Sequence, residues 1–222
     1  MASELEWKFA VSDDDRLEEI RRWIVKNVPE AGPAVIWQMR TTYYDAPDRR
    51  FSKAHITIRR RMENARSILC VKAPAADPSA GRASLAYLAA PPDPFGLAGG
   101  KLRGEWECEG TDLLAALPDF VAQGAPSCLL EAEACGLEQL CGAEFTRTAI
   151  PLRFPDGSVS ELALDSGRLL GRRRTVPLCE LELEKKEGAE TASLKLLEHL
   201  VRRFNLLPEP RSKYARARAI DL

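Results

Sequence analysis

The sequence predicts an α+β fold in which a closed antiparallel sheet carries helices on its outer side. Three observations indicate this fold. Short segments alternate charged and apolar residues, which predicts strands because neighbouring side chains of a strand point to opposite faces. Other segments repeat apolar residues at helical spacing. The charged strand faces, finally, carry clustered acids and clustered bases. The chain has 222 residues, enough for one packed core, and we expect a single domain over residues 1–222.

The first expected element is a strand over residues 4–9, which alternates charged and apolar side chains. Glu4, Glu6 and Lys8 share one of its faces, and Leu5, Trp7 and Phe9 share the other. A helix should follow, with Ser12 as N-cap and acidic residues in its first turn. Pro29 and the residues after it should end this helix.

The remaining elements follow in chain order. We expect strands at 36–44, 55–61 and 67–72, then a long loop at 73–100, which is rich in Ala, Pro and Gly. A strand at 103–109 and two short helical segments within 111–140 come next. A hairpin follows, with arms at 145–154 and 159–165 around a Pro-Asp-Gly turn. A strand at 179–184 and a helix at about 189–204 complete the pattern, and a helical 211–216 would place Lys213 and Arg216 on one face.

The charged strand faces favour closure of the sheet. Two strands carry acidic pairs and several others carry basic residues: Glu4 with Glu6, Glu180 with Glu182, and Lys8, Arg59, Arg61, Lys72, Arg103 and Arg147. An open sheet could show such a face to water. In a closed sheet the charges line the interior, where they require balance or bound ions. Clustered carboxylates are typical of Mg²⁺ or Mn²⁺ sites, and clustered Arg and Lys of phosphate sites. Together they indicate phosphoryl chemistry.

Composition and the N-terminal sequence limit the kinds of binding partner and the cellular compartment that we expect. Lys and Arg total 32 against 33 Asp and Glu, and this lack of a basic excess disfavours a nucleic acid duplex as partner. The N-terminal residues lack the pattern of a signal peptide, and no apolar segment is long enough to span a membrane. The six cysteines form no CxxC pair, which favours free thiols in a reducing cytosol. We therefore expect a cytoplasmic protein with no membrane partner.

At this point the chain resembles a known family. Glu4-Leu5-Glu6-Trp7-Lys8 is similar to the ExExK signature of the CYTH superfamily, the triphosphate tunnel metalloenzymes. Further similar segments follow in the family's order over nearly the whole chain: 43–48, 58–61, 71–72, 103–105, 145–147, 161–167, 179–184 and 212–217. The resemblance implies a closed antiparallel β-barrel tunnel of about eight strands, with helices packed on the outside.

The resemblance also implies roles for individual residues. Metal ligands for one or two Mg²⁺ or Mn²⁺ ions would be Glu4, Glu6, Asp165, Glu180 and Glu182. Phosphate oxygens would be bound by Lys8, Arg59, Arg61, Lys72, Arg103, Arg147, Lys213 and Arg216. Catalysis would involve Glu4 and Glu6 through the metal, Lys8, and Glu105, which together with Glu161 would tune the cations or orient water. A lysine among phosphates should stay protonated, which argues against Lys8 as general base.

The function implied is metal-dependent hydrolysis of a triphosphate by metal-activated water, with inorganic tripolyphosphate as the leading substrate. Hydrolysis of thiamine triphosphate or a nucleotide, class IV adenylate cyclase activity and non-catalytic polyphosphate binding remain alternatives. The His-Phe pair associated with the cyclases is absent from the N-terminus. The two acidic strands argue against a protein that only binds polyphosphate, because anion binding alone requires no carboxylates as metal ligands. A monomer and a homodimer are both compatible with the sequence.

Overall fold

The computed structural model describes residues 2–74 and 101–221, and the side chains of 5–74 and 103–221. Its strands in these ranges are β1 (Ala2–Ala10), β2 (Val35–Asp45), β3 (Thr57–Glu63), β4 (Arg66–Pro74), β5 (Lys101–Glu109), β6 (Glu138–Arg153), β7 (Val159–Leu170), β8 (Thr175–Glu187) and β9 (Leu207–Pro208). The α-helices are α1 (Asp14–Asn27), α2 (Arg50–Lys53), α4 (Leu113–Ala122), α5 (Ala132–Cys135), α6 (Thr191–Phe204) and α7 (Lys213–Ala219). A 3₁₀ turn, Ser127–Glu131, lies between α4 and α5.

All nine described strands belong to one antiparallel sheet. Their order is β5-β4-β3-β2-β6-β7-β8-β1-β9. Strand β1 pairs along Leu5–Ala10 with β8 and along Ala2–Glu6 with β5. Each strand from β1 to β8 therefore has a partner on both sides. The α+β class and the antiparallel sheet that the sequence predicted are confirmed.

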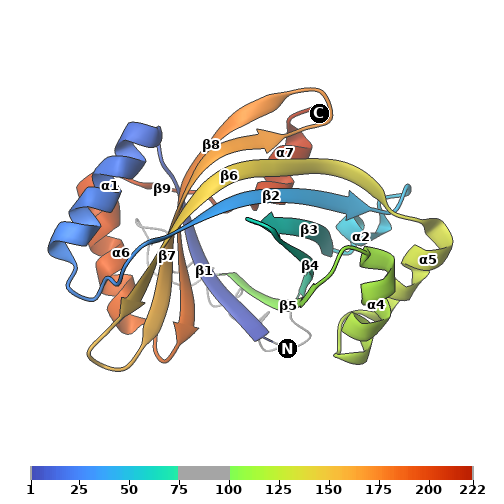
Figure 1. Ribbon diagram of the computed structural model, residues 1–222, viewed down its shortest axis with the longest axis horizontal. Helices are drawn as coiled ribbons and strands as arrows, with labels where there is room; N and C mark the ends of the chain where they lie inside the picture. Colours follow the sequence, from blue (N-terminus) through green and yellow to red (C-terminus); the bar gives the residue numbers. More distant parts are fainter. Residues whose placement is uncertain (1, 75–100, 222) are drawn as a thin grey trace, which may run out of the picture.

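Helices cover the sheet in two separate groups (Figure 1). On one side α1 and α6 pack over a buried cluster that includes Trp7, Phe9, Leu162 and Leu181. On the other side α2, α4 and α5 surround a second cluster, which includes Trp106. Between the two groups β2 and β6 arch across the molecule (Figure 1). The alternation read from the sequence thus sends the apolar side chains outward to the helices.

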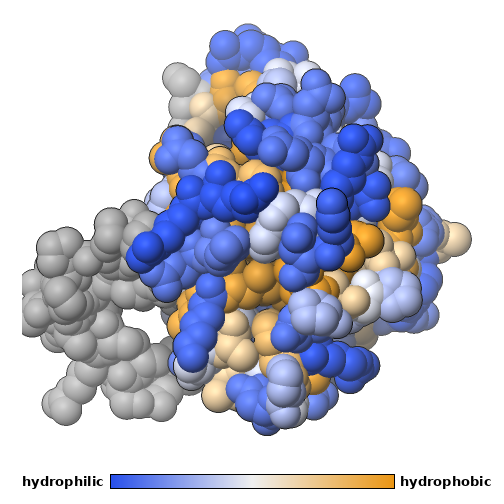
Figure 2. All heavy atoms as spheres, turned by 90° about the vertical axis from the view of Figure 1, so that its left-hand side faces the viewer, coloured by the Kyte–Doolittle hydropathy of each residue, from blue (hydrophilic) through white to orange (hydrophobic). Residues whose placement is uncertain are grey.

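The face formed by α1 and α6 is mostly hydrophilic, with apolar residues showing between the polar ones (Figure 2). Helix α1 buries Leu17, Ile20 and Ile24 against the sheet, as its apolar spacing requires. Its N-cap is Asp13, whose carboxylate accepts a hydrogen bond of 2.8 Å from the backbone N–H of Arg16. The expected cap, Ser12, was wrong by one residue. Within the residues described, no helix combines the length and the apolar character needed to cross a membrane.

Two short elements were not predicted. Strand β9 pairs with the end of β1 and has two residues, which is too short for a period-two pattern to predict it. Helix α2 has four residues and follows Arg49, which adopts a left-handed backbone conformation with φ of 64°. Asp45 organises this turn by accepting hydrogen bonds from the backbone N–H groups of Ala46 and Phe51. The expected loop at 73–100 lies almost wholly outside the described residues.

Truncation of the core under α1 and α6 should destabilise the protein strongly. Leu162 is completely buried in that cluster. Leu162→Ala should lower the free energy of unfolding by about 2–5 kcal/mol, because it removes apolar contacts and leaves a cavity. Val25→Ala, on the exposed side of α1, is the control and should change it by less than about 0.5 kcal/mol. Urea denaturation measures both, and equal losses would contradict the assignment of the core.

Candidate functional site

The charged face of the sheet forms one central cavity. It is lined by seven of the eight predicted phosphate-binding residues, Lys8, Arg59, Arg61, Lys72, Arg103, Arg147 and Lys213, and by Glu6 and Glu182. These side chains come from strands far apart in the chain and from the start of α7. The eighth residue, Arg216, is not among the lining residues and forms an ion pair with Glu180. A single cavity that gathers so many cations is built to hold a polyanion.

Three carboxylates form a buried cluster beside this cavity. Asp165 on β7 faces Glu180 on β8 across the antiparallel register, and Glu182 lies two residues further along β8 on the same face. One carboxylate oxygen of each residue lies within 4.8 Å of the other two. Asp165 and Glu180 have no exposed surface, so their charges require compensation from within the protein.

The Lys213 ammonium is a cation that contacts all three carboxylates of this cluster. Its Nζ lies 2.7 Å from Asp165 Oδ2 and 3.0 Å from Glu182 Oε1, and it also forms an ion pair with Glu180. The α7 helix presents Lys213 as its first residue, because the Ser212 hydroxyl caps the helix by accepting from the Ala215 N–H. Burial lowers the pKa of Lys213, but the three carboxylates outweigh it and raise that pKa above its ordinary value.

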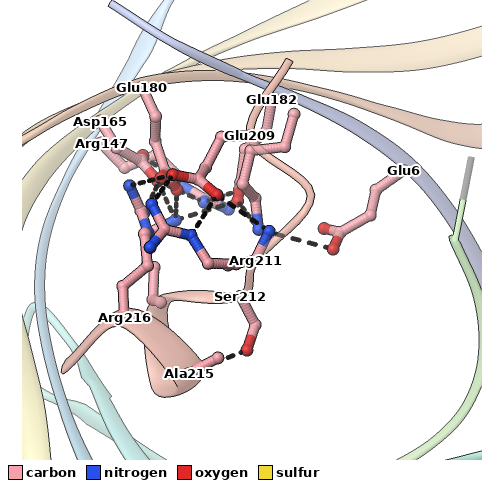
Figure 3. A network of polar contacts seen from close by, with 12 residues as sticks. Glu6, Arg147, Asp165, Glu180, Glu182, Glu209, Arg211, Ser212, Ala215 and Arg216 are labelled. Atoms are coloured by element: carbon pink, nitrogen blue, oxygen red, sulfur yellow. Dashed lines mark hydrogen bonds and ion pairs between the residues drawn. The ribbon is translucent and has the colours of Figure 1, made fainter. Parts of the chain in front are cut away.

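Two arginines complete the network (Figure 3). Arg147 makes a bidentate contact with Asp165, at 2.8 and 2.7 Å, and also contacts Glu182. Arg216 contacts Glu180, and Glu209 lies behind it at 3.9 Å. The acidic cluster is therefore neutralised by cations that belong to the same chain.

Lys8 joins the network from β1. Its Nζ lies 2.9 Å from Glu182 Oε1 and 3.6 Å from Glu6 Oε1. Burial lowers the pKa of Lys8, but Glu182 and Glu6 raise it more strongly, to about 12. Lys8 is therefore protonated at neutral pH. This charge state suits phosphate binding and disfavours the role of general base.

Glu180 and Glu182, the two glutamates of the buried cluster, have pKa values shifted in opposite directions. Burial raises the pKa of Glu180, and the neighbouring Glu182 carboxylate adds to the effect. Burial acts on Glu182 too, but Lys213, Lys8 and Arg147 hold the pKa of Glu182 well below its usual range. Glu182 therefore stays ionised and anchors the surrounding cations.

A second group of ion pairs lies on β3, β4 and β5. Glu105 Oε1 lies 3.1 Å from Arg59 and 3.2 Å from Lys72. Glu107 lies 3.4 Å from Arg59 and 3.3 Å from Arg61. The buried Cys70 thiol points to the same place and donates to Glu105 Oε1 at 3.2 Å. The cations of this side are thus also paired with internal carboxylates.

The predicted metal ligands do not all lie together. Asp165, Glu180 and Glu182 form one cluster, whereas the Glu6 carboxylate lies near Lys8 at the edge of the central cavity. The Glu4 side chain lies outside the described residues. Glu105, predicted as catalytic, lies in the second group with Arg59 and Lys72.

Sequence reasoning missed several residues at the site. Period-two alternation places Glu107 on the strand face of Glu105, but no role was predicted for it. Cys70 lies two residues before Lys72 on β4, so the same alternation also places it on the inward face. The cavity is also lined by three aromatic residues that were not among the predicted site residues, Tyr43, Phe145 and Tyr214. Their rings are engaged internally: Tyr43 packs on Tyr214, and the Lys213 ammonium lies 5.0 Å from the Phe145 ring centre.

The donor set of the acidic cluster fits a hard divalent cation. Asp165, Glu180 and Glu182 offer oxygen ligands of the kind that Mg²⁺ and Mn²⁺ prefer. They already surround one positive charge, the Lys213 ammonium, which stands in for such a cation. A divalent ion at this place requires that Lys213 turn toward another anion.

Fold and site together define a class of antiparallel α+β proteins whose sheet gathers acidic and basic side chains around one central cavity. A family model described as CYTH domain matches residues 2–217. The chain belongs to the CYTH domain family, as its sequence motifs indicated.

Solved structures share this fold at low sequence identity. A proposed adenylyl cyclase from Hippeastrum with a dominant triphosphatase activity is 15% identical, with a TM-score of 0.56 over 97% of this chain and 95% of that chain. A protein from Pyrococcus horikoshii is 19% identical, with a TM-score of 0.54 over 96% and 97%. A proposed adenylate cyclase from Bacillus halodurans is 15% identical, with a TM-score of 0.52 over 96% of each chain. At these identities the likeness concerns the fold.

Removal of the central ammonium should destabilise the protein. Lys213→Met leaves three buried carboxylates without their shared cation, and we expect a loss of about 3–5 kcal/mol in the free energy of unfolding. Lys26→Met, on the exposed side of α1, is the matched control and should change it by less than about 0.5 kcal/mol. Chemical denaturation measures both. Wild-type stability in Lys213→Met would show that the cluster does not depend on this ion pair.

Glu209 should make a pH-dependent contribution to stability. Hydrogen bonds from Arg211 lower its pKa from 4.5 to about 2. Because the folded pKa lies below the unfolded one, the contribution is complete above pH 4.5 and is lost as the pH falls to about 2. Near neutral pH, Glu209→Gln should cost about 1 kcal/mol, a small value because the Arg211 side chain is 63% exposed. Denaturation at several pH values should show the two proteins converging in acid, and a constant difference would contradict this account.

Proposed function

We propose that the sheet closes through the β1–β5 pairing into a tunnel and that the protein hydrolyses a triphosphate within it. The observation that carries this proposal is the central cavity, where seven cations from five strands and from α7 meet two carboxylates. The pairing of β1 with both β8 and β5 supports closure. Membership of the CYTH domain family supports the same reading.

Phosphate oxygens would replace carboxylates as partners of the cations. Arg59 and Lys72 are bound to Glu105, and Lys8 is bound to Glu182, at distances of 2.9 to 3.2 Å. A phosphate group offers several acceptor oxygens and can take over such contacts, since Arg and Lys form short, charge-assisted bonds with it. The internal carboxylates thus hold the cations in place before the substrate arrives.

A divalent cation, Mg²⁺ or Mn²⁺, would be held by Asp165, Glu180 and Glu182, with Glu6 and Glu4 as further candidates. When bound, it would neutralise phosphate charge and activate water for attack. Lys213 would then turn from the carboxylates to the substrate. Lys8, Arg59 and Arg147 would stabilise the charge that develops on the transferring phosphoryl group. Glu105, beside Arg59, would set the position of that guanidinium.

Inorganic tripolyphosphate is the substrate that the cavity favours. Its lining offers many cations for phosphate oxygens, while the Tyr43, Phe145 and Tyr214 rings contact one another or the neighbouring ammonium. Binding energy would therefore come mainly from the phosphate chain. The free thiols of the six cysteines fit a reducing compartment. A cytoplasmic location, and the choice between monomer and homodimer, stay predictions.

A substrate panel tests this function. We expect kcat/KM for tripolyphosphate to exceed the values for thiamine triphosphate and ATP by at least about tenfold, because the differential contacts are to phosphate. Phosphate release would be measured with Mg²⁺ and with Mn²⁺, and cAMP would be measured when ATP is the substrate. A chelator should abolish turnover. A tenfold preference for an organic triphosphate, or formation of cAMP, would contradict the assignment to inorganic triphosphate.

Matched variants connect the activity to the cavity. Glu6→Gln removes a carboxylate that lines the cavity, and we expect a loss of about 100-fold in kcat/KM. Glu187→Gln, exposed at the end of β8, removes the same charge outside the cavity and should retain activity. Thermal midpoints of both variants verify the fold. Equal activity in the two variants would place the reaction elsewhere.

A further inference from the structure

The central cavity shares lining residues with further cavities, two of which lie on different sides of it. Beside α7 it shares Thr57, Arg103, Ser212 and Tyr214 with a cavity of 350 Å³. In the other direction it shares Met39, Arg61 and Arg147 with a cavity of 240 Å³. The two outer cavities have no lining residue in common. Among the described residues these two outer cavities form two mouths of the central cavity, and a third outer cavity, which shares Met39 and Phe145 with it, lies on the side of β2, β6 and β7.

The two mouths carry opposite charge. The basic mouth, the cavity beside α7, is lined by Arg103 and the exposed Arg218, and no carboxylate is present among its described lining residues. The acidic mouth holds five glutamates against three cations. Its glutamates are Glu63, Glu105, Glu107, Glu161 and Glu184. A polyanion thus meets attraction at one mouth and repulsion at the other.

The cations of the acidic mouth do not remove this repulsion. Arg61 lies 2.6 Å from Glu63, and Lys186 lies 2.6 Å from Glu184. Arg147, the third, is bound by Asp165 and Glu182 deeper in the molecule. Its pKa is lowered by burial but raised more by these carboxylates, and the Glu161 charge contributes to the rise. Every cation that lines this mouth therefore already has a carboxylate partner. Because Glu105 and Glu107 are themselves paired with Arg59 and Lys72 of the central cavity, the repulsion of an entering polyanion falls mainly to Glu161 and Glu184.

We propose that the substrate enters and leaves through the basic mouth rather than the acidic mouth, and that Glu161 and Glu184 determine this choice by repelling polyanions from the acidic mouth. Repulsive elements of this kind set specificity in many binding sites. The inference rests on the proposed function only in taking an inorganic triphosphate as the ligand. Entry from one side also orients the bound phosphate chain, because the end of that chain that does not react stays at the basic mouth. It also prevents a long phosphate chain from threading through the tunnel.

A rescue experiment tests this direction. The association rate of tripolyphosphate would be followed by stopped-flow tryptophan fluorescence without metal, and kcat/KM would be measured in parallel with metal. Arg218→Glu should slow association by at least about tenfold at low salt and by much less at high salt, because it reverses the charge of the basic mouth. Arg218→Gln should show a smaller loss in the same direction.

The decisive protein combines Arg218→Glu with Glu161→Gln and Glu184→Gln. If neutral side chains open the acidic mouth, association should recover by at least about fivefold relative to Arg218→Glu alone. The matched control replaces Glu133 and Glu187, two exposed glutamates, by Gln in the Arg218→Glu background. It has the same net charge and should give no recovery.

The outcomes separate the two proposals. Recovery in both combined proteins would indicate an effect of net charge and would overturn the inference, and so would recovery in neither. Wild-type protein that binds tripolyphosphate without hydrolysing it would overturn the proposed function and leave the direction of entry supported by the rescue. If the wild-type protein hydrolyses tripolyphosphate but the combined variant shows no recovery of association, the proposed function stands and the proposed direction of entry is overturned. Thermal midpoints show that each variant is folded.

Discussion

The ion network around Lys213 is the interaction on which the rest of the site depends. Asp165 and Glu180 are completely buried, and a buried carboxylate is costly unless cations lie against it. Lys213 contacts all three carboxylates of the cluster, and Arg147, Lys8 and Arg216 each contact one or two. The network joins β1, β6, β7, β8 and α7, so the same contacts that neutralise the buried charge also hold these elements in register around the cavity.

This arrangement explains how one cavity can be stable when empty and still bind a highly charged ligand. Six of the cavity's cations are kept in position by carboxylates of the protein, which limits the reorganisation required on binding: Lys8, Arg59, Arg61, Lys72, Arg147 and Lys213. The ligand must compete with those carboxylates, so its affinity is the difference between two sets of ion pairs. A ligand with few charges gains little from such an exchange, whereas a phosphate chain can replace several partners at once.

Much of this site was predictable because strand alternation is a local property. The period of two placed Glu6 and Lys8 on one face of β1 and Leu5 and Trp7 on the other. It could not place Lys213, whose position depends on how α7 packs against strands distant in sequence. The pairing of Glu107 with Arg59 and Arg61 required the order of β3, β4 and β5. The same alternation places Phe145 on the strand face of Arg147, but its contact with the Lys213 ammonium depends on how α7 packs. The opposite charge of the two mouths is a property of the assembled sheet and has no local signal.

The double pairing of β1 has a consequence for how the protein is made. This strand comes early in the chain, but its partners β8 and β9 come near its end. Contacts between segments so distant in sequence form slowly, because the chain between them must be ordered first. During synthesis β1 therefore emerges long before its neighbours exist, with the apolar face of Trp7 and Phe9 uncovered. The hairpins of β3 with β4 and of β6 with β7 can form earlier from neighbouring segments, and the joining of β1 to β8 brings the Lys8 and Glu182 charges together as a late event of folding.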